Sequence, residues 1–197
     1  MTNTQVRSSF GRLYDYADLA NMPTPSINEI VEHLATEQRF GGACKGYDLY
    51  SIAQHGVGTS LLAEQISQGD PIVALYALHH DDHEFLLKDA MTPLKNYVKM
   101  RTKIDVYGEL SDQIDNVIFT EVLNLPHPMP DWIKVIVDEA DYRMYVTEGL
   151  ALVRGFEPPE GIIPAPFNIT PMMPEQAAKA YLLRHEKLVK RRGSRVI

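Results

Sequence analysis

The chain has 197 residues, of which 45% are hydrophobic, so it is long enough to bury the core of one domain of ordinary size. Its formal net charge of -7 argues against binding to duplex DNA, because phosphate contacts need clustered lysine and arginine. No apolar run approaches the roughly 18 residues of a membrane span, and the first residues do not resemble a signal peptide. The single Cys44 excludes an intrachain disulfide, so we expect a cytoplasmic protein without membrane partners.

The first quarter of the chain is predicted to hold an irregular arm and one helix. Residues 7–20 alternate weakly between apolar and polar positions, which favours a short hairpin or an irregular arm. A proline-rich stretch then delays the first helix until Ser26, where Ser26 and Glu29 form a capping box. This helix is predicted to run to about Arg39. The glycines in residues 40–46 predict a loop after it.

Two further helices are predicted to follow closely. A second capping pattern opens a helix over residues 51–67, and its helical spacing turns His55 towards the core. Asp70 followed by Pro71 starts a third helix, which is predicted to continue as far as His83.

The remainder of the chain is also predicted to be helical. Helical spacing returns in residues 109–124, from Asp131 to Arg154, and from about Pro174 into the basic C-terminal tail. The proline-rich segment 158–174 is predicted to be a surface loop. Convincing strands are absent, so the sequence predicts an all-α fold in the form of a compact bundle.

Residues 79–84, which read His-His-Asp-Asp-His-Glu, form the densest polar cluster of the chain. They follow the apolar run 72–78, so some of these groups are expected to lie close to the core. An unpaired buried charge is costly, and such a cluster is either a solvated helix end or a group that neutralises itself on a metal. The local composition alone leaves both interpretations open.

A second acidic residue in an apolar setting favours the metal interpretation. Asp141 lies beside Ala140 on the apolar stripe of the predicted helix from Asp131 to Arg154. His55, the His80–Asp81 pair and Asp141 could therefore converge from three helices. Two imidazoles and two carboxylates can occupy four positions around a divalent ion and leave positions for water and substrate.

The order of these motifs resembles that of the HD-domain metal-dependent phosphohydrolases. Residues 50–55 read Y-S-I-A-Q-H, residues 78–81 read L-H-H-D, residues 93–95 read P-L-K, and residues 140–143 read A-D-Y-R. These strings are similar to those of small bacterial and phage members, and the resemblance covers roughly residues 10–155. It implies an HD-domain helical bundle in a single domain, 1–197, with a core at about 26–155 and a C-terminal loop and helix at 156–197.

The resemblance also implies a function and a cofactor. It implies hydrolysis of nucleotide phosphate bonds, as in bacterial 5′-deoxynucleotidases and phage dATP triphosphohydrolases. The expected substrates are chiefly deoxynucleotides, with dATP or dAMP as the first candidates. The products would be the nucleoside and either phosphate or triphosphate. The metal would be Co, Mn, Zn, Ni, Fe or Mg. The implied metal ligands are His55, His80, Asp81 and Asp141.

Further roles follow from the same resemblance. Glu84, which is predicted to lie one helical turn after His80, would orient the attacking water, and Asp89 would position that water or protonate the leaving oxygen. Arg39 and Lys95 are the candidates for phosphate binding. Phe40 would be either a core residue or a platform on which the base stacks.

Alternatives remain at this point. The enzyme could act instead on cyclic nucleotides or alarmones, or the chain could be a non-catalytic nucleotide-binding regulatory protein of the HD type. The complete set of candidate ligands favours an enzyme. We also expect a homo-oligomer, a dimer or a hexamer. His79 and His83 are interpreted as structural or as supporting the ligands, and His33, His127 and His185 as surface histidines.

Overall fold

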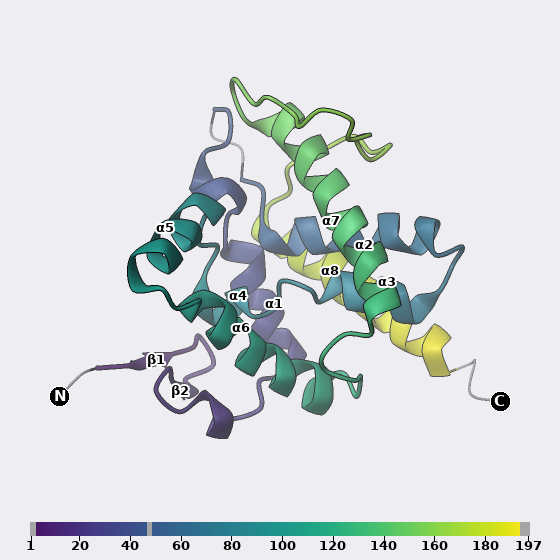
Figure 1. Ribbon diagram of the computed structural model, residues 1–197. Helices are drawn as coiled ribbons and strands as arrows, with labels where there is room; N and C mark the ends of the chain where they lie inside the picture. The colour runs from purple at the N-terminus through teal and green to yellow at the C-terminus, as the bar shows by residue number, and fades with distance from the viewer. Residues whose placement is uncertain (1–2, 47–48, 194–197) are drawn as a thin grey trace.

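The computed structural model describes residues 3–46 and 49–193, and it is predominantly helical (Figure 1). The elements in chain order are β1 (Gln5–Arg7), β2 (Leu13–Asp15), the 3-10 turn η1 (Leu19–Asn21), α1 (Ile27–Thr36), the 3-10 turn η2 (Arg39–Gly42), α2 (Ile52–Ile66), α3 (Pro71–Leu78), α4 (Glu84–Leu87), α5 (Thr92–Thr102), α6 (Val106–Val117), the π-helical turn η3 (Ile118–Val122), α7 (Asp131–Leu152) and α8 (Pro174–Gly193). The prediction of an all-α fold is confirmed. The one sheet in the described residues is a small antiparallel hairpin, in which Val6 lies opposite Tyr14.

The core lies where α2 packs against α3, α7 and α8. Figure 1 shows α7 crossing over α2 and α3, and α8 also contacts α1 and α3. Tyr14 from the hairpin and Tyr181 from α8 are fully buried in the same hydrophobic cluster as Leu75 of α3. Both ends of the chain therefore contribute to one core. No helix in the described ranges is long and apolar enough to cross a membrane.

Side-chain caps begin the helices where the sequence predicted them. The Ser26 hydroxyl accepts a hydrogen bond from the Glu29 backbone N–H, and Ser51 does the same for Gln54. The carboxylate of Asp70 accepts one from the Ile72 N–H at 2.8 Å. Each cap satisfies a donor that the first turn of a helix leaves unpaired.

The first helix is shorter than predicted and ends at Thr36 rather than near Arg39. The chain leaves the helix because it pairs with the segment before α2. Arg39 N–H donates to the Tyr50 carbonyl at 2.9 Å, and the Ile52 N–H donates to the Glu37 carbonyl at 3.0 Å. This pairing brings the side chain of Arg39 next to the start of α2.

The third helix also ends early, at Leu78, so His80 and His83 do not lie on it as predicted. The Leu78 carbonyl oxygen lies 3.0 Å from the Tyr181 hydroxyl oxygen, which packs against the end of the helix. In a continuous helix this carbonyl would accept from Asp82, whose N–H instead bonds the His79 carbonyl. Residues 79–83 therefore form a turn, and a new short helix, α4, begins at Glu84. Glu84 is thus not one helical turn after His80.

Two helices lie between α4 and α7, where the sequence predicted only one. α5 (Thr92–Thr102) has no buried residue and was missed, because its apolar side chains do not face the core. The predicted helix over 109–124 begins earlier, at Val106, and continues into η3. Asp105 caps its first turn through the Gly108 N–H.

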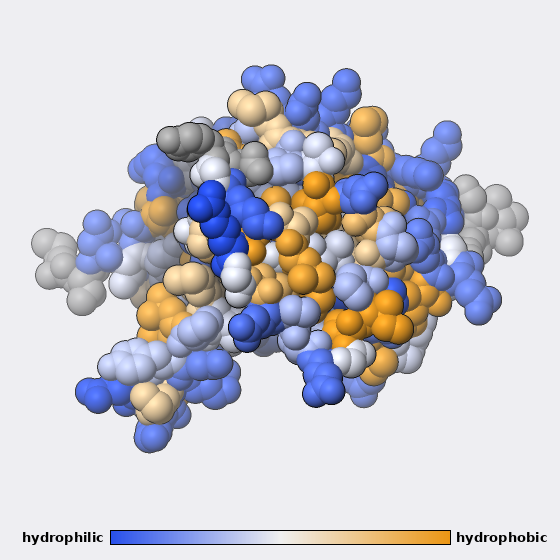
Figure 2. Space-filling view, turned by 90° about the horizontal axis from the view of Figure 1, so that it is seen from above, coloured by the Kyte–Doolittle hydropathy of each residue, from blue (hydrophilic) through white to orange (hydrophobic). Residues whose placement is uncertain are grey.

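Hydrophobic residues also reach the surface. Figure 2 shows orange patches between blue residues on the face seen from above. Val135, Ile163 and Met173 are among the most exposed large apolar side chains. More than about half of the surface of a folded protein is apolar, so this exposure by itself identifies no partner.

Candidate metal centre

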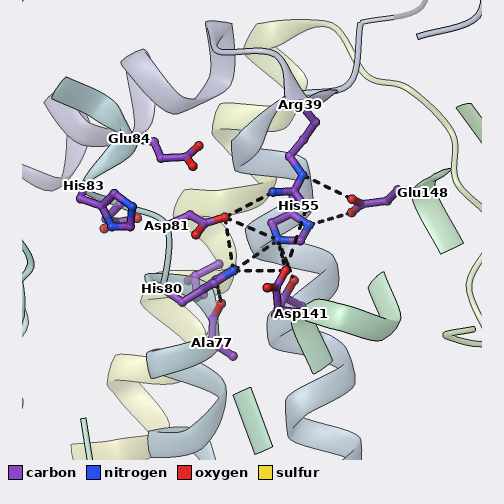
Figure 3. Close-up of polar contacts among 12 residues, drawn as sticks. Arg39, His55, Ala77, His80, Asp81, His83, Glu84, Asp141 and Glu148 are labelled. Atoms are coloured by element: carbon purple, nitrogen blue, oxygen red, sulfur yellow. Dashed lines mark hydrogen bonds and ion pairs between the residues drawn. The ribbon is translucent and has the colours of Figure 1, made fainter. Parts of the chain in front are cut away.

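Four side chains from three parts of the chain converge on one point (Figure 3). His55 comes from α2, His80 and Asp81 from the turn after α3, and Asp141 from α7. His55 Nε2 lies 3.3 Å from His80 Nε2, 3.0 Å from Asp141 Oδ1 and 3.6 Å from Asp81 Oδ2. His80 Nε2 lies 3.3 Å from Asp81 Oδ2 and 3.6 Å from Asp141 Oδ1.

These separations match those of ligands around one cation. With bonds of about 2.1 Å, neighbouring ligands lie about 3.0 Å apart in an octahedron and about 3.4 Å apart in a tetrahedron. His55, His80 and Asp141 form a group whose donor atoms lie within 4.8 Å of one another. Imidazole and carboxylate donors suit Zn, Co, Fe, Ni or Mn. The residues present therefore fit a divalent metal.

Both histidines are held so that Nε2 faces this point. The Nδ1 of His80 donates to the Ala77 carbonyl at 2.8 Å. The Nδ1 of His55 donates to Glu148 Oε1 at 2.8 Å. A hydrogen bond at one ring nitrogen fixes the tautomer and leaves the other nitrogen free to bind metal. The two rings are thus oriented as metal-binding histidines usually are.

Glu148 is a part of the site that the sequence analysis missed. It is fully buried on α7, where its carboxylate also accepts a hydrogen bond from the Tyr50 hydroxyl at 2.9 Å. It lies seven residues after Asp141, two helical turns along the same face. That spacing was visible in the sequence and could have identified it.

The carboxylates of Asp81 and Asp141 favour positive charge at the point where the four side chains meet. Burial opposes protonation of His80, but the Asp81 carboxylate and a hydrogen bond with Asp141 raise the pKa of His80 to about 10. Burial likewise opposes ionisation of Asp141, yet His55 and His80 hold the pKa of Asp141 well below its usual value. A divalent cation takes the place of such protons when it binds, because its ligands are then deprotonated.

Arg39 lies at the edge of the centre rather than away from it. Its guanidinium Nη1 lies 3.5 Å from Asp81 Oδ2 and Nε lies 3.4 Å from Glu148 Oε2, while only 12% of the side chain is exposed. Burial is the largest influence on the Arg39 pKa and lowers it, but the attraction of the Glu148 and Asp81 carboxylates outweighs burial and raises the pKa overall. Arg39 is therefore a fixed positive charge beside the ligands.

The proposed catalytic carboxylates lie on the other side of Asp81. Glu84 is only 3% exposed, and burial together with the charges of Asp81 and Asp89 raises its pKa to about 8. Lys95 Nζ lies 4.0 Å from Glu84 Oε1. Asp89 is half-buried and donates its backbone N–H to Glu37. The structure thus brings Lys95 to Glu84, and Asp89 is close enough for its charge to act on Glu84.

Phe40 lies on the side of the centre where α7 runs. It occupies the left-handed region with φ of 59°, which is unusual for a residue other than glycine. Its ring centroid lies 5.9 Å from that of Tyr145, and the Arg39 guanidinium carbon lies 5.7 Å from it. Such strained conformations gather at functional sites. Phe40 is half-buried.

A second buried network supports the turn that carries His80 and Asp81. His79 Nδ1 lies 2.7 Å from Asp82 Oδ2, and its Nε2 lies 2.9 Å from His185 Nδ1. Tyr181 donates to Asp82 Oδ1. His185 is thus bonded to a buried partner, and its interpretation as a surface histidine was wrong.

The comparisons with known proteins assign no activity. No protein-family model matches the sequence. The chain is 28% identical over 206 aligned residues to an uncharacterized protein of Rhodobacter capsulatus, and the match covers 96% of this chain and 98% of that protein. The similarity therefore runs along nearly the whole of both chains.

Proposed function

We propose that this chain is a metal-dependent phosphohydrolase of the HD-domain type that acts on deoxynucleotides, with dATP or dAMP leading. The observation that carries the proposal is the convergence of His55 Nε2, His80 Nε2, Asp81 Oδ2 and Asp141 Oδ1 at separations of 3.0 to 3.6 Å. The resemblance of the motifs supplies the reaction class, and the geometry supplies a place for the metal that this class requires.

The metal, when bound, would polarise a phosphoryl oxygen and make water more acidic. The residues around it have separate tasks. Glu84 would orient the attacking water and accept its proton, since a carboxyl group with a pKa of about 8 exchanges protons near neutral pH. Asp89 would help to position that water, and the proton that Glu84 accepts would pass to the oxygen that leaves when the phosphorus–oxygen bond breaks.

An anionic substrate also needs positive charge beyond the metal, because two ligand carboxylates already cancel a dication. Arg39 offers a planar guanidinium beside Asp81. Lys95 lines a hollow of about 230 Å³ that opens beside His83 and contains Lys88 and Lys99 as well. Lys99 is paired there with Asp105, which also lines the hollow, so Lys95 is the candidate for phosphate binding.

The base would lie on the opposite side, against Phe40 and the aromatic side chains of α7. Tyr145 contacts Phe40, and Tyr142 stacks on Tyr145 with a centroid separation of 6.1 Å. A base that stacks on an aromatic ring gains about 1–3 kcal/mol irrespective of its identity. Selectivity for adenine must therefore come from polar groups around the ring edge.

The test is a screen of nucleotides with Mn, Co, Zn and Mg, in which phosphate release and chromatography identify the products. Deoxynucleotides, and dATP or dAMP above the others, are expected to be hydrolysed fastest. Phe40→Ala is expected to raise KM for the nucleotide more than for a small aryl phosphate. Faster hydrolysis of cyclic dinucleotides than of any deoxynucleotide would overturn the substrate class, and binding without turnover with every metal would favour a regulatory protein.

A further inference from the structure

We propose that the hollow between α7 and residues 161–163 binds the base of the substrate, and that Glu139 selects bases that carry an exocyclic amino group, as adenine does. The hollow has a volume of about 650 Å³, which is within the range of pockets that hold small ligands. Asp141, one of the proposed metal ligands, lies in its wall. This inference rests on the proposed function, because it assigns the base of the nucleotide to the hollow that adjoins the metal centre.

The charge of the hollow fits the base end of a nucleotide rather than its phosphates. Its lining carries three acidic residues and one basic residue, which are Asp138, Glu139, Asp141 and Arg143. The hollow beside His83 has the opposite balance, with three lysines and one acidic residue. A phosphate is anionic, so the lysines attract it and the carboxylates repel it. An uncharged base meets no such repulsion in the hollow at α7.

Apolar side chains supply a surface on which a base can pack. Tyr142 is 43% exposed and Ile163 is 72% exposed, and both line the hollow together with Ile162. Tyr142 also stacks on Tyr145, whose ring contacts Phe40. The hollow therefore shares a wall with the aromatic side chains that the proposed function gives to the base. A flat ring that packs there removes exposed apolar surface from water, which is favourable.

Arg143 connects the two sides of the hollow and orients Glu139. The Nε of Arg143 donates to the Ile163 carbonyl at 2.9 Å, which ties residues 161–163 to α7. The Nη1 of Arg143 donates to Glu139 Oε1 at 3.2 Å. Because this contact uses Oε1, the other oxygen of Glu139 can accept a hydrogen bond from a ligand.

A carboxylate at this place favours one kind of base. An ionised carboxylate accepts hydrogen bonds and donates none. The amino group of adenine can donate to Glu139, whereas the carbonyl oxygen that hypoxanthine carries at the same ring position would be repelled. The two bases share the purine ring system, so they separate the effect of Glu139 from that of packing.

The test uses 2′-deoxyadenosine and 2′-deoxyinosine, which carry no phosphate, so that binding is measured without turnover. Ligand-observed NMR titration of the intact chain measures both affinities. 2′-Deoxyadenosine is expected to bind about 10-fold more tightly, the effect of one hydrogen bond to a charged group. Glu139→Gln is expected to reduce this preference to less than about 3-fold, because an amide both donates and accepts. Ile163→Ala is expected to weaken both nucleosides equally.

Glu32→Gln is the matched control. Glu32 is also an exposed glutamate on a helix, but it lies on α1 and lines neither hollow. This variant is expected to bind both nucleosides as the unaltered chain does. Equal affinity of the unaltered chain for the two nucleosides, no binding of either, or a Glu139→Gln chain that keeps the full preference would overturn the inference.

The two proposals fail in different ways. A chain that prefers 2′-deoxyadenosine through Glu139 but hydrolyses no nucleotide contradicts the proposed function and leaves the base site standing. A chain that hydrolyses deoxynucleotides but shows no preference that depends on Glu139 contradicts only the base site.

Discussion

Tyr181 donates a hydrogen bond to Asp82 Oδ1 over 2.5 Å, although 99 residues separate them along the chain. Both residues are fully buried. The same hydroxyl lies 3.0 Å from the Leu78 carbonyl, which ends α3. The last helix therefore shapes the turn that presents two of the proposed ligands.

Tyr181→Phe is expected to lower the free energy of unfolding by about 1.5–3 kcal/mol, because a hydrogen bond to a buried charged group is lost. The affinity for metal should fall as well, since the turn with His80 and Asp81 is less well held. Urea denaturation and metal titration at low temperature measure the two effects. Tyr97→Phe, at an exposed tyrosine, is the control. Unchanged metal affinity in Tyr181→Phe would show that α8 supports only stability.

Asp81→Ala is expected to lose bound metal and activity together. Asp81 contributes Oδ2 to the metal centre, and its removal also leaves Arg39 without one of its carboxylate partners. Elemental analysis of the purified variant checks this result. Full metal occupancy in Asp81→Ala would contradict the assignment of Asp81 as a ligand.

Glu148→Gln is expected to weaken metal binding by about 10–100-fold, the usual effect of altering the partner that orients a metal-binding histidine. The carboxylate holds Nδ1 of His55 at 2.8 Å. Tyr50→Phe removes only the hydrogen bond from Tyr50 to Glu148 and is expected to have a smaller effect. Competition with a chelator measures both affinities, and equal losses would contradict the role given to Glu148.

Glu84→Gln is expected to keep the bound metal and to lose about 100-fold or more in kcat, because a positioned proton-transfer group is removed. Steady-state kinetics with dATP or dAMP test this. A variant with an unchanged kcat and a raised KM would make Glu84 a binding residue instead.

Gly56→Ala is expected to be more destabilising than Gly58→Ala. A Cβ at Gly56 would lie 2.8 Å from the Leu78 carbonyl oxygen, which is backbone and cannot move alone. A Cβ at Gly58 would meet the end of the Met144 side chain, which can rotate away. Overpacking of the first kind costs about 1–3 kcal/mol. Thermal unfolding of the two variants compares them directly, and equal melting temperatures would contradict this account.

The sequence predicted the start of most helices because a cap is a local signal. Ser26, Ser51 and Asp70 each bond a backbone donor two or three residues away. The end of α3 could not be predicted in this way, because it depends on Tyr181 from α8. The end of α1 likewise depends on pairing with the segment before α2.

The parts of the candidate site that the sequence predicted were likewise those with a local signal. His55 and Asp141 stood out because polar residues on apolar stripes need partners. His185 lies four residues after Tyr181 and three before Leu188 on the apolar face of α8, a spacing that its interpretation as a surface histidine overlooked. Asp115 was missed as the partner of His83 because the two lie on different elements.

The order of synthesis has a consequence for the buried network of α8. A ribosome makes His55 and the His80–Asp81 pair early, Asp141 much later, and Tyr181 and His185 later still. The contacts of Tyr181 and His185 with Asp82 and His79 cannot form before α8 has been translated and has packed. A chain interrupted by a stop codon before Tyr181 would keep every proposed ligand and still lack the contacts of α8 with the turn that carries His80 and Asp81.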